Sequence, residues 1–266
     1  MYQGDIPPTL QRLVGQLSRI PGVIAVTLGG SRARGEGRPD SDWDFGLYYR
    51  GGINSDDVRA LGYTGYVAEP GEWGRLVNGG GWLEIEGQRV DVLYRDLNVA
   101  EYWVKEAQQG RFEVDNVAGH IVGLPTYVLV GELALGRVLV GDLERPSFPD
   151  ALRSSAPPWW EGNASFSLMY AEGYARRGEV TAFAGSLARA TMAVAHARFV
   201  QRGMWALNEK RLVQRAGLEP ADEIIATVGK EPEALTQTLE RMRDVLGLAR
   251  PQGLKADEVV RKERNV

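Results

Sequence analysis

The sequence predicts an α/β domain with a mixed sheet, followed by an all-helical domain. Short apolar, β-branched runs alternate with helical patterns up to about residue 142. Beyond residue 160 the apolar side chains recur with helical spacing instead. Residues 145–160 contain four prolines and three serines, a shift in composition that is typical of a linker. We therefore expect a first domain over residues 1–147, a helical bundle over 148–250 and a charged tail over 251–266.

The first domain is expected to begin with a helix. Leu10, Leu13 and Leu17 share one helical face, and a Pro-Gly pair ends the pattern. The glycine-rich residues 53–80 suggest a short helix and loops. The other patterns predict strands at 23–28, 43–49 and 136–142, a hairpin of strands 82–85 and 89–94, and helices at 99–109 and 127–135.

The second domain shows only helical patterns. In the last of them Leu235, Leu239, Met242 and Leu246 form a stripe with i, i+4, i+7, i+11 spacing. Helices are expected at 168–177, 182–202, 209–216 and 232–246.

Composition excludes several kinds of site. The 266 residues include no cysteine, which rules out disulfides, thiolate zinc sites and a cysteine nucleophile. Only two histidines are present, too few for a histidine-rich metal site. No apolar run reaches the roughly 20 residues that span a bilayer, and the amino terminus does not look like a signal peptide. We expect a cytoplasmic protein with no membrane partner.

Charge is unevenly distributed along the chain. The net charge is −4, and this balance argues against a general nucleic-acid binder. Residues 1–150 hold 14 basic and 21 acidic residues, while the remainder is net basic. An acidic half suits a metal cation or a cationic substrate, although a solvated surface would look the same.

The most informative segment runs from Leu28 to Tyr49. A buried strand enters the Gly29-Gly30-Ser31 turn, whose amides and hydroxyl are suited to phosphate oxygens. Arg32 and Arg34 add positive charge nearby. Taken alone, such a sequence is more typical of a tight turn with a serine cap.

Asp42 and Asp44 occupy the start of the next predicted strand. Their i, i+2 spacing places both carboxylates on one face, with Trp43 and Phe45 on the other. Two adjacent carboxylates repel unless a cation offsets them, and hard oxygen ligands suit Mg²⁺. Two aspartates with this spacing, found without another motif, nevertheless more often face solvent than bind a metal ion.

The two features together resemble the polymerase-β-like nucleotidyltransferase superfamily. The matching residues are Gly30 to Asp44, GSRARGEGRPDSDWD, after the strand VIAVTL. The resemblance covers residues 23–142 well, and the helical half only by layout. It implies a nucleotidyltransferase fold and Mg²⁺-dependent transfer of a nucleoside monophosphate.

The superfamily also uses a third carboxylate on a later strand, and Asp91 is the best match. It lies between apolar residues, where an unpaired charge would be costly. Glu84 and Glu86 are rivals, and Asp91 could instead be a structural partner of a neighbouring arginine. The long gap after Asp44 implies an insertion at residues 53–80.

The resemblance assigns roles to these residues. Asp42, Asp44 and Asp91 would hold two Mg²⁺ ions, and Asp91 is a candidate general base. Gly30 and Ser31 would bind the β- and γ-phosphates of a nucleoside triphosphate, with Arg34 nearby. We expect AMP from ATP to pass to a hydroxyl of a small molecule, with pyrophosphate leaving.

The layout of the two domains resembles the antibiotic nucleotidyltransferases, the aminoglycoside and lincosamide enzymes. The tract GELALGRVLVGD looks like the close of their catalytic domain, and Lys210 lies in a tract that resembles a phosphate-contacting one. Lys210 could equally be a solvent-exposed lysine with no role in binding. Trp159 and Glu172 are candidates for binding the acceptor, although interface packing and a surface charge, respectively, are favoured for them. His196 is expected to be packed rather than catalytic.

Three functional hypotheses remain from the sequence. The first is transfer to a small acceptor such as an aminoglycoside, which would make the protein an antibiotic-resistance enzyme. The second keeps the chemistry but takes a protein or tRNA as acceptor, as in toxin-type nucleotidyltransferases. The third is a nucleotide-binding regulator without catalysis, which the three-carboxylate set argues against. A monomer and a homodimer are both compatible with the sequence.

Overall fold

The computed structural model of the chain describes residues 6–249. The described residues divide into two compact units, one made of residues 6–117 and 124–147 and the other of residues 118–123 and 148–249. The expected charged tail over 251–266 lies outside the described residues. We call these parts the first and second units.

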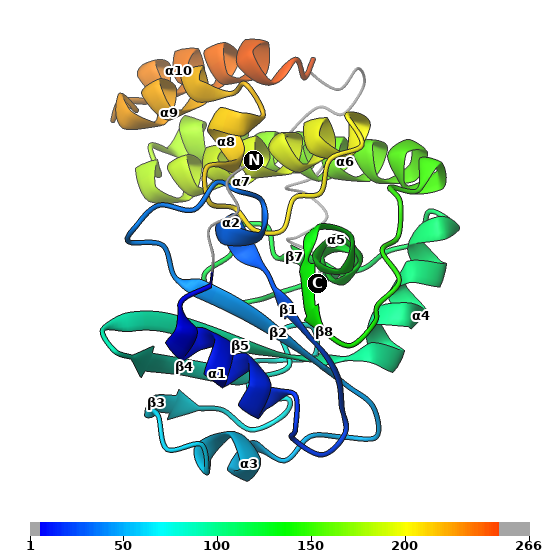
Figure 1. Cartoon of the computed structure of the whole chain (residues 1–266). Helices are drawn as coiled ribbons and strands as arrows, with labels where there is room; N and C mark the ends of the chain where they lie inside the picture. Colours follow the sequence, from blue (N-terminus) through cyan, green and yellow to red (C-terminus); the bar gives the residue numbers. More distant parts are fainter. Residues whose placement is uncertain (1–5, 250–266) are drawn as a thin grey trace, which may run out of the picture. The chain divides into compact units, whose positions relative to one another are not determined.

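The first unit is built on a six-stranded mixed sheet (Figure 1). Its strand order is β3-β4-β5-β2-β1-β8, in which β2 and β5 run parallel and every other neighbouring pair is antiparallel. The strands are β1 Val23–Leu28, β2 Trp43–Tyr49, β3 Thr64–Val67, β4 Gly80–Ile85, β5 Gln88–Asp96 and β8 Arg137–Val140. Its helices are α1 Pro8–Leu17, α2 Gly30–Ala33, α3 Ser55–Arg59, α4 Leu97–Gln108 and α5 Tyr127–Leu135.

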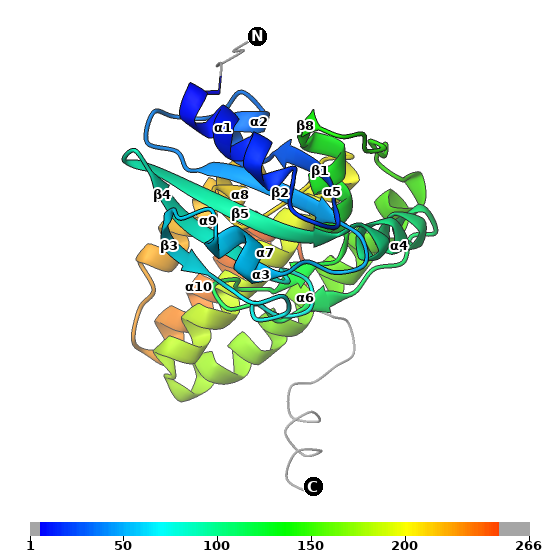
Figure 2. The same ribbon diagram turned by 60° about the horizontal axis from the view of Figure 1, so that its bottom comes forward.

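The two faces of this sheet differ in chemistry. One face carries Phe45, Leu47, Val90 and Val92, which form a buried core with α1. Figure 2 shows α1 lying along that side of the strands. The other face packs against α4 and α5 only toward one end, through a smaller apolar cluster around Tyr48. The rest of this second face carries Asp44, Asp91, Glu84 and two exposed aromatic side chains, and we call it the polar face.

Most of the expected elements of the first unit are confirmed. Alternation of side chains explains β2, β4 and β5, because each of them buries one set of residues in the core with α1. The hairpin forms where the sequence predicts it, and its turn uses positive φ at Glu86 and Gly87.

Two pairings escape prediction from sequence. Residues 53–80 contain the expected short helix, but they also contain the edge strand β3, whose glycine-rich composition disguises it. At Gly65 a Cβ would lie 2.0 Å from the Trp82 carbonyl oxygen, so the close pairing of β3 with β4 requires glycine there. A second, two-stranded sheet joins β6 Val114–Asp115 to β7 Leu124–Pro125, and such short strands leave no pattern in the sequence.

The second unit is helical, as expected. Its longest helices, α6 and α7, pack against each other, and α10 packs against both. The helices are α6 Asp150–Arg177, α7 Val180–Gln201, α8 Leu212–Arg215, α9 Glu219–Ala226 and α10 Pro232–Leu246. The predicted helix at 209–216 is reduced to α8, and α9 was not predicted.

The expected linker over residues 145–160 is wrong in its second half. Helix α6 begins at Asp150 and continues through Pro157 and Pro158. A proline inside a helix removes one amide donor, and this favours a break. The helix continues because its buried face is uninterrupted: its buried apolar side chains recur every three or four residues, at 152, 156, 160, 164, 168, 171 and 175.

Within the described residues, none of the helices has the length and apolar character needed to cross a bilayer.

Candidate functional site

The Gly-Gly-Ser turn links β1 to β2 at the edge of the polar face. The Gly29 amide donates to the Asp44 carbonyl oxygen at 2.7 Å, which fixes the turn against β2. Residues Gly30–Ala33 then form the single helical turn α2, with Gly29 as its N-cap. The first amides of a helical turn have no acceptor within the helix, so they are suited to anionic oxygens.

Gly30 is required by both its backbone and its neighbour. Its φ is +60°, a left-handed conformation that glycine adopts most readily. A Cβ at this position would lie 1.8 Å from Oδ2 of Asp44. The Asp44 carboxylate therefore packs directly over Gly30, and the turn and the carboxylate form one local structure.

Asp44 and Asp91 face each other across two parallel strands. They are register partners in the β2–β5 pairing, so their side chains leave the same face of the sheet. Neighbouring strands lie about 4.8 Å apart. Both residues are partly buried. The sequence-predicted third carboxylate is thus placed beside the second.

Asp42 lies just before β2 and beside Arg89. Its Oδ1 atom is 2.6 Å from Nε of Arg89, which also donates to the Asp40 carbonyl oxygen at 3.0 Å. Despite this closeness, Oδ1 is buried and accepts no hydrogen bond of good geometry from the residues that the structure describes. Arg89 thus neutralises Asp42 without satisfying this oxygen.

The carboxylates fit a magnesium ion by their chemistry. Asp44 and Asp91 present hard oxygen ligands side by side, and Oδ1 of Asp42 is a buried oxygen that lacks a hydrogen bond. Among residues 6–249, no three His, Cys, Asp or Glu side chains are gathered closely enough to enclose a metal by themselves. Mg²⁺ suits such an open arrangement, because it keeps several waters and shares its ligand shell with substrate phosphates.

The two arginines after the turn make contacts within the protein. Arg32 donates to the Ser41 carbonyl oxygen at 2.6 Å and stacks over the Trp43 ring, 4.1 Å from its centroid. It therefore holds the loop that leads into β2. Nε of Arg34 lies 3.1 Å from a carboxylate oxygen of Glu36, so its charge is partly offset.

The rivals of Asp91 do not align with Asp44. Glu86 belongs to the hairpin turn, where it accepts a hydrogen bond from Thr9 of α1 at 2.7 Å. Glu84 is exposed on β4 and is the register partner of Arg89. The structure thus separates both glutamates from the β2–β5 carboxylate pair.

Two residues beside the site were missed from the sequence. Arg89 contacts Asp42, and Trp82 is the register partner of Asp91 on β4. The hairpin prediction contains a usable signal for both, because an antiparallel register around residues 86–87 pairs position 82 with position 91. A cavity of about 450 Å³ lies near the loop that leads into β2 and is lined by Arg32, Ser41, Trp43 and Arg89 among others.

The candidate residues of the second unit have separate surroundings. Trp159 is 43% exposed, whereas its neighbour Trp160 is buried and stacks on His196. Glu172 lies 3.9 Å from Nη2 of the buried Arg243. Lys210 is exposed in a turn rather than at the start of a helix, and its amide donates to the Asn208 side chain.

His196 is buried in the second unit and packs against Trp160, with ring centroids 4.5 Å apart. Burial, with the nearby His120, lowers its pKa to about 3. The ring is therefore neutral in the folded protein, and a packed residue agrees with the expectation from the sequence.

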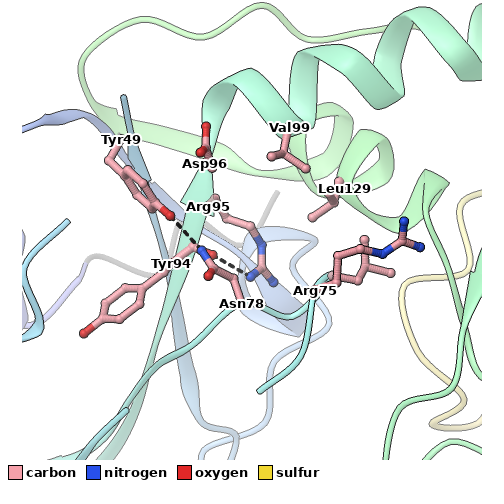
Figure 3. Close-up of a pocket in the computed structure, with 9 residues that line it drawn as sticks. Tyr49, Arg75, Asn78, Tyr94, Arg95, Asp96, Val99 and Leu129 are labelled. Carbon is pink, nitrogen blue, oxygen red and sulfur yellow. Dashed lines mark hydrogen bonds between the residues drawn. The ribbon is translucent and has the colours of Figure 1, made fainter. Parts of the chain in front are cut away.

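A second cavity lies at the other end of β2 and β5 (Figure 3). It measures about 110 Å³ and is lined by residues that include Tyr49, Asn78 and Arg95. The Arg95 guanidinium is buried and binds both carboxylate oxygens of Glu132, at 2.5 and 2.8 Å. Asn78 donates to the Tyr49 hydroxyl at 2.8 Å. Because its charges are paired internally, this end of the strands is structural in character.

Comparisons with known proteins place the first unit in a family. Residues 10–111 match the family model described as nucleotidyltransferase domain. No curated protein matches the chain.

Two solved structures are similar to the chain. One is a nucleotidyltransferase-like protein from Exiguobacterium sibiricum, with 10% identity over 90% of this chain and 73% of that chain and a TM-score of 0.45. The other is spectinomycin adenyltransferase AAD(9) from Enterococcus faecialis with ATP and spectinomycin, with 12% identity over 90% and 97% of the two chains and a TM-score of 0.32. Both TM-scores lie below 0.5, so the family assignment rests on the domain match.

The matched residues include the turn and all three aspartates of the candidate site. The chain therefore carries a nucleotidyltransferase domain over residues 10–111, the class of domain that its Gly-Gly-Ser turn and paired aspartates predict.

Proposed function

We propose that the protein transfers AMP from ATP to a hydroxyl group of a small molecule of the aminoglycoside type and releases pyrophosphate. One observation carries the proposal: the Asp44 carboxylate packs over Gly30 and faces Asp91 across adjacent strands. This brings a phosphate-binding turn and a pair of carboxylates into contact, which is the arrangement that nucleotidyl transfer requires.

The turn binds the triphosphate. The amides at Gly30 and Ser31 begin a helical turn, and the Ser31 hydroxyl adds a donor. These groups hold the β- and γ-phosphates, so that the α-phosphorus lies over the carboxylates. Arg34 contributes positive charge at the same place, at the expense of its contact with Glu36.

The carboxylates organise the reaction at the α-phosphorus. Asp42, Asp44 and Asp91 would hold two Mg²⁺ ions, which supply charge neutralisation for the attacking and leaving oxygens. Asp91 lies on the far side of Asp44 from the turn and accepts the proton of the attacking hydroxyl. The acceptor oxygen forms a bond to the α-phosphorus, the bond to the β-phosphate oxygen breaks, and pyrophosphate leaves.

Arg89 sets the resting state of this site. Its guanidinium offsets the charge of Asp42 at 2.6 Å. For Asp42 to take up a metal ion, Arg89 must move away from it. Because Arg89 is largely exposed, its side chain is free to turn toward solvent or toward an anionic ligand.

The second unit holds three further candidates that the resemblance suggests, Lys210 for a phosphate and Trp159 and Glu172 for an acceptor. Lys210 and Trp159 are exposed, whereas Glu172 lies 3.9 Å from Nη2 of Arg243. We place the protein in the cytoplasm, where ATP and Mg²⁺ are present, as a monomer or a homodimer.

The test is pyrophosphate release in the presence of Mg²⁺. Each of the four nucleoside triphosphates is combined with a panel of aminoglycosides and lincosamides, and Asp44→Asn is the matched control because it keeps the shape that packs over Gly30. We expect release with ATP that depends on one acceptor and on Asp44. An Asp44→Asn variant with full activity would remove the catalytic assignment.

Two other outcomes point to the alternative functions. Calorimetric binding of ATP without release for any small acceptor would favour a protein or tRNA acceptor. Binding of ATP that survives without Mg²⁺ and without Asp44 would favour a nucleotide-binding regulator.

A further inference from the structure

One row of side chains crosses the polar face of the sheet from its edge to the catalytic turn. Register pairs Tyr66 with Trp82, Trp82 with Asp91, and Asp91 with Asp44. Residues that are paired in register leave the same face of a sheet. An aromatic pair on β3 and β4 therefore lies in line with the carboxylate pair on β5 and β2.

Three aromatic rings form a layer at the outer end of this row. Trp73 stacks on Trp82 with ring centroids 4.8 Å apart and planes 18° apart, and Tyr66 lies 5.8 Å from Trp82. Gly80 lies beneath Trp73, and a Cβ there would lie 1.8 Å from the Val92 carbonyl oxygen and 3.1 Å from the Trp73 ring. We call Tyr66, Trp73 and Trp82 the aromatic platform.

The platform is open to ligands. Trp82 is 55% exposed and Tyr66 is 45% exposed. The opposite face of the same strands is buried against the core with α1. Exposure of an indole is unfavourable to folding, so packing within the first unit does not explain why a tryptophan occupies the position beside Asp91.

Two carboxylates lie near the platform, Glu72 and Glu84, and Glu84 is also the register partner of Arg89. The Tyr66 hydroxyl donates to Glu72, and this hydrogen bond lowers the pKa of the Glu72 carboxyl. Glu72 is therefore ionised at neutral pH and is fixed beside the rings. Glu84 is exposed on the polar face, two positions from Trp82. Carboxylates around an exposed indole favour a cation over its face.

The position of the platform suits the acceptor rather than the nucleotide. The phosphate-binding turn adjoins Asp44, whereas the platform adjoins Asp91 on the opposite side of the carboxylate pair. A nucleotide held at the turn therefore approaches from one side. The attacking hydroxyl must approach from the other side, where Trp82 is the nearest register neighbour.

We propose that the aromatic platform is the acceptor subsite, and that it selects hydroxylated ring compounds carrying cationic amino groups. The ring lies on Trp82, its ammonium groups meet Glu72 and Glu84, and one hydroxyl reaches Asp91. This inference rests on the proposed function for the identity of the reaction, but binding at the platform is independent of transfer.

The experiment measures binding of acceptor probes by calorimetry. The probes are kanamycin, spectinomycin and kanamycin acetylated on every amino group, which keeps the rings and removes the charges. Each probe is titrated into the full chain and into the Asp44→Asn, Trp82→Leu, Trp82→Phe and Tyr102→Leu variants. Tyr102 is the matched control, because it is an aromatic side chain that is 54% exposed on α4, where its ring meets Trp103 edge-on.

We expect a cationic probe to bind the unaltered chain and the acetylated probe to bind far more weakly. Trp82→Leu should weaken cationic-probe binding about fivefold, the size of a cation–π contact at an exposed site, with ATP binding unchanged. Trp82→Phe should fall between, and Tyr102→Leu should bind normally. Asp44→Asn should still bind the probe although it transfers nothing, which separates this inference from the reaction itself.

Three results would overturn the inference. The first is equal binding of a cationic probe by the Trp82→Leu variant and the unaltered chain. The second is equal binding of kanamycin and its acetylated form. The third is absence of binding by both cationic probes, in which case the acceptor belongs to another class even if nucleotidyl transfer to it is later demonstrated. Melting curves confirm that each variant remains folded.

Discussion

The two units of the protein treat their charged residues in opposite ways. In the first unit, Asp44 and Asp91 share a register position and a face with the exposed Trp82. In the second unit, Glu172 lies beside the buried Arg243, and His196 lies inside the helical core. The sheet thus gathers chemistry-bearing groups at a surface, whereas the helices largely use theirs internally.

The cause of this difference is geometric. Adjacent strands lie about 4.8 Å apart, so register alone brings together residues that are distant in sequence. Helices instead lie about 8–10 Å apart and contact through apolar stripes, so a polar residue reaches another helix only through its side chain. In this chain, the sequence therefore predicts which candidate side chains lie together more reliably for strands than for helices.

The largest expected effect is on the carboxylate pair. Asp44→Asn keeps the size of the side chain that packs over Gly30 but removes its charge. Loss of several kcal/mol of transition-state stabilisation corresponds to a fall in kcat of about 10³-fold or more. Melting temperature should stay the same. Rates of pyrophosphate release, measured at saturating ATP and acceptor, check the prediction, and a fall smaller than tenfold would contradict it.

The next effect concerns the buried imidazole of the second unit. Burial keeps His196 neutral, with a pKa of about 3, while its ordinary pKa is near 6.5. Between these values the unfolded chain binds more protons than the folded chain. The free energy of unfolding should therefore fall as pH decreases from about 6.5 toward 3, by up to about 1.4 kcal/mol per pH unit.

Urea unfolding of the unaltered chain and of His196→Phe, at several pH values, tests this sign. The phenylalanine ring keeps the stacking on Trp160 but cannot be protonated. We expect its stability to depend less on pH over this range. Parallel curves for the two proteins would show that His196 does not control acid unfolding.

A third prediction sharpens the role of the turn. Gly30→Ala introduces a Cβ 1.8 Å from Oδ2 of Asp44 and must displace that carboxylate. Gly35→Ala is the matched control, because Gly35 also has a positive φ of 72° but has no atom within 4 Å of a Cβ. Both changes should lower stability by about 1 kcal/mol through backbone strain.

Only Gly30→Ala should also lower kcat, by about 10²-fold, which corresponds to a rise of about 2.7 kcal/mol in the activation barrier. Steady-state rates for the two variants make the comparison. Equal rates would mean that the contact between turn and carboxylate is not needed for the reaction.

The sequence predicts the fold more fully than it predicts the site. The strands at 23–28 and 43–49 and the helix at 232–246 are confirmed, because their apolar periodicity reflects direct burial. The strand β3 and the helical nature of residues 150–160 were missed, because glycine and proline weaken the local signal while packing restores the structure.

Within the site, the spacing of Asp42 and Asp44 and the pairing of Asp91 follow from strand geometry. The contact of Arg89 with Asp42 does not, because it depends on a side-chain conformation. Trp82 could have been found from the hairpin register, since that register pairs it with Asp91. The roles of the three aspartates stay predictions until the variants are measured.

The smallest expected effect concerns a residue of the helical unit. Lys210 is exposed in a turn, where a contact with a phosphate contributes about 1 kcal/mol. Lys210→Gln should therefore raise the KM for ATP about fivefold and leave kcat unchanged. Lys230→Gln is the matched control, because Lys230 is equally a lysine exposed on the second unit. If both variants show the same KM for ATP, the nucleotide is bound without Lys210. The residues that bind the nucleotide would then belong to the first unit, in line with the contrast between the two units.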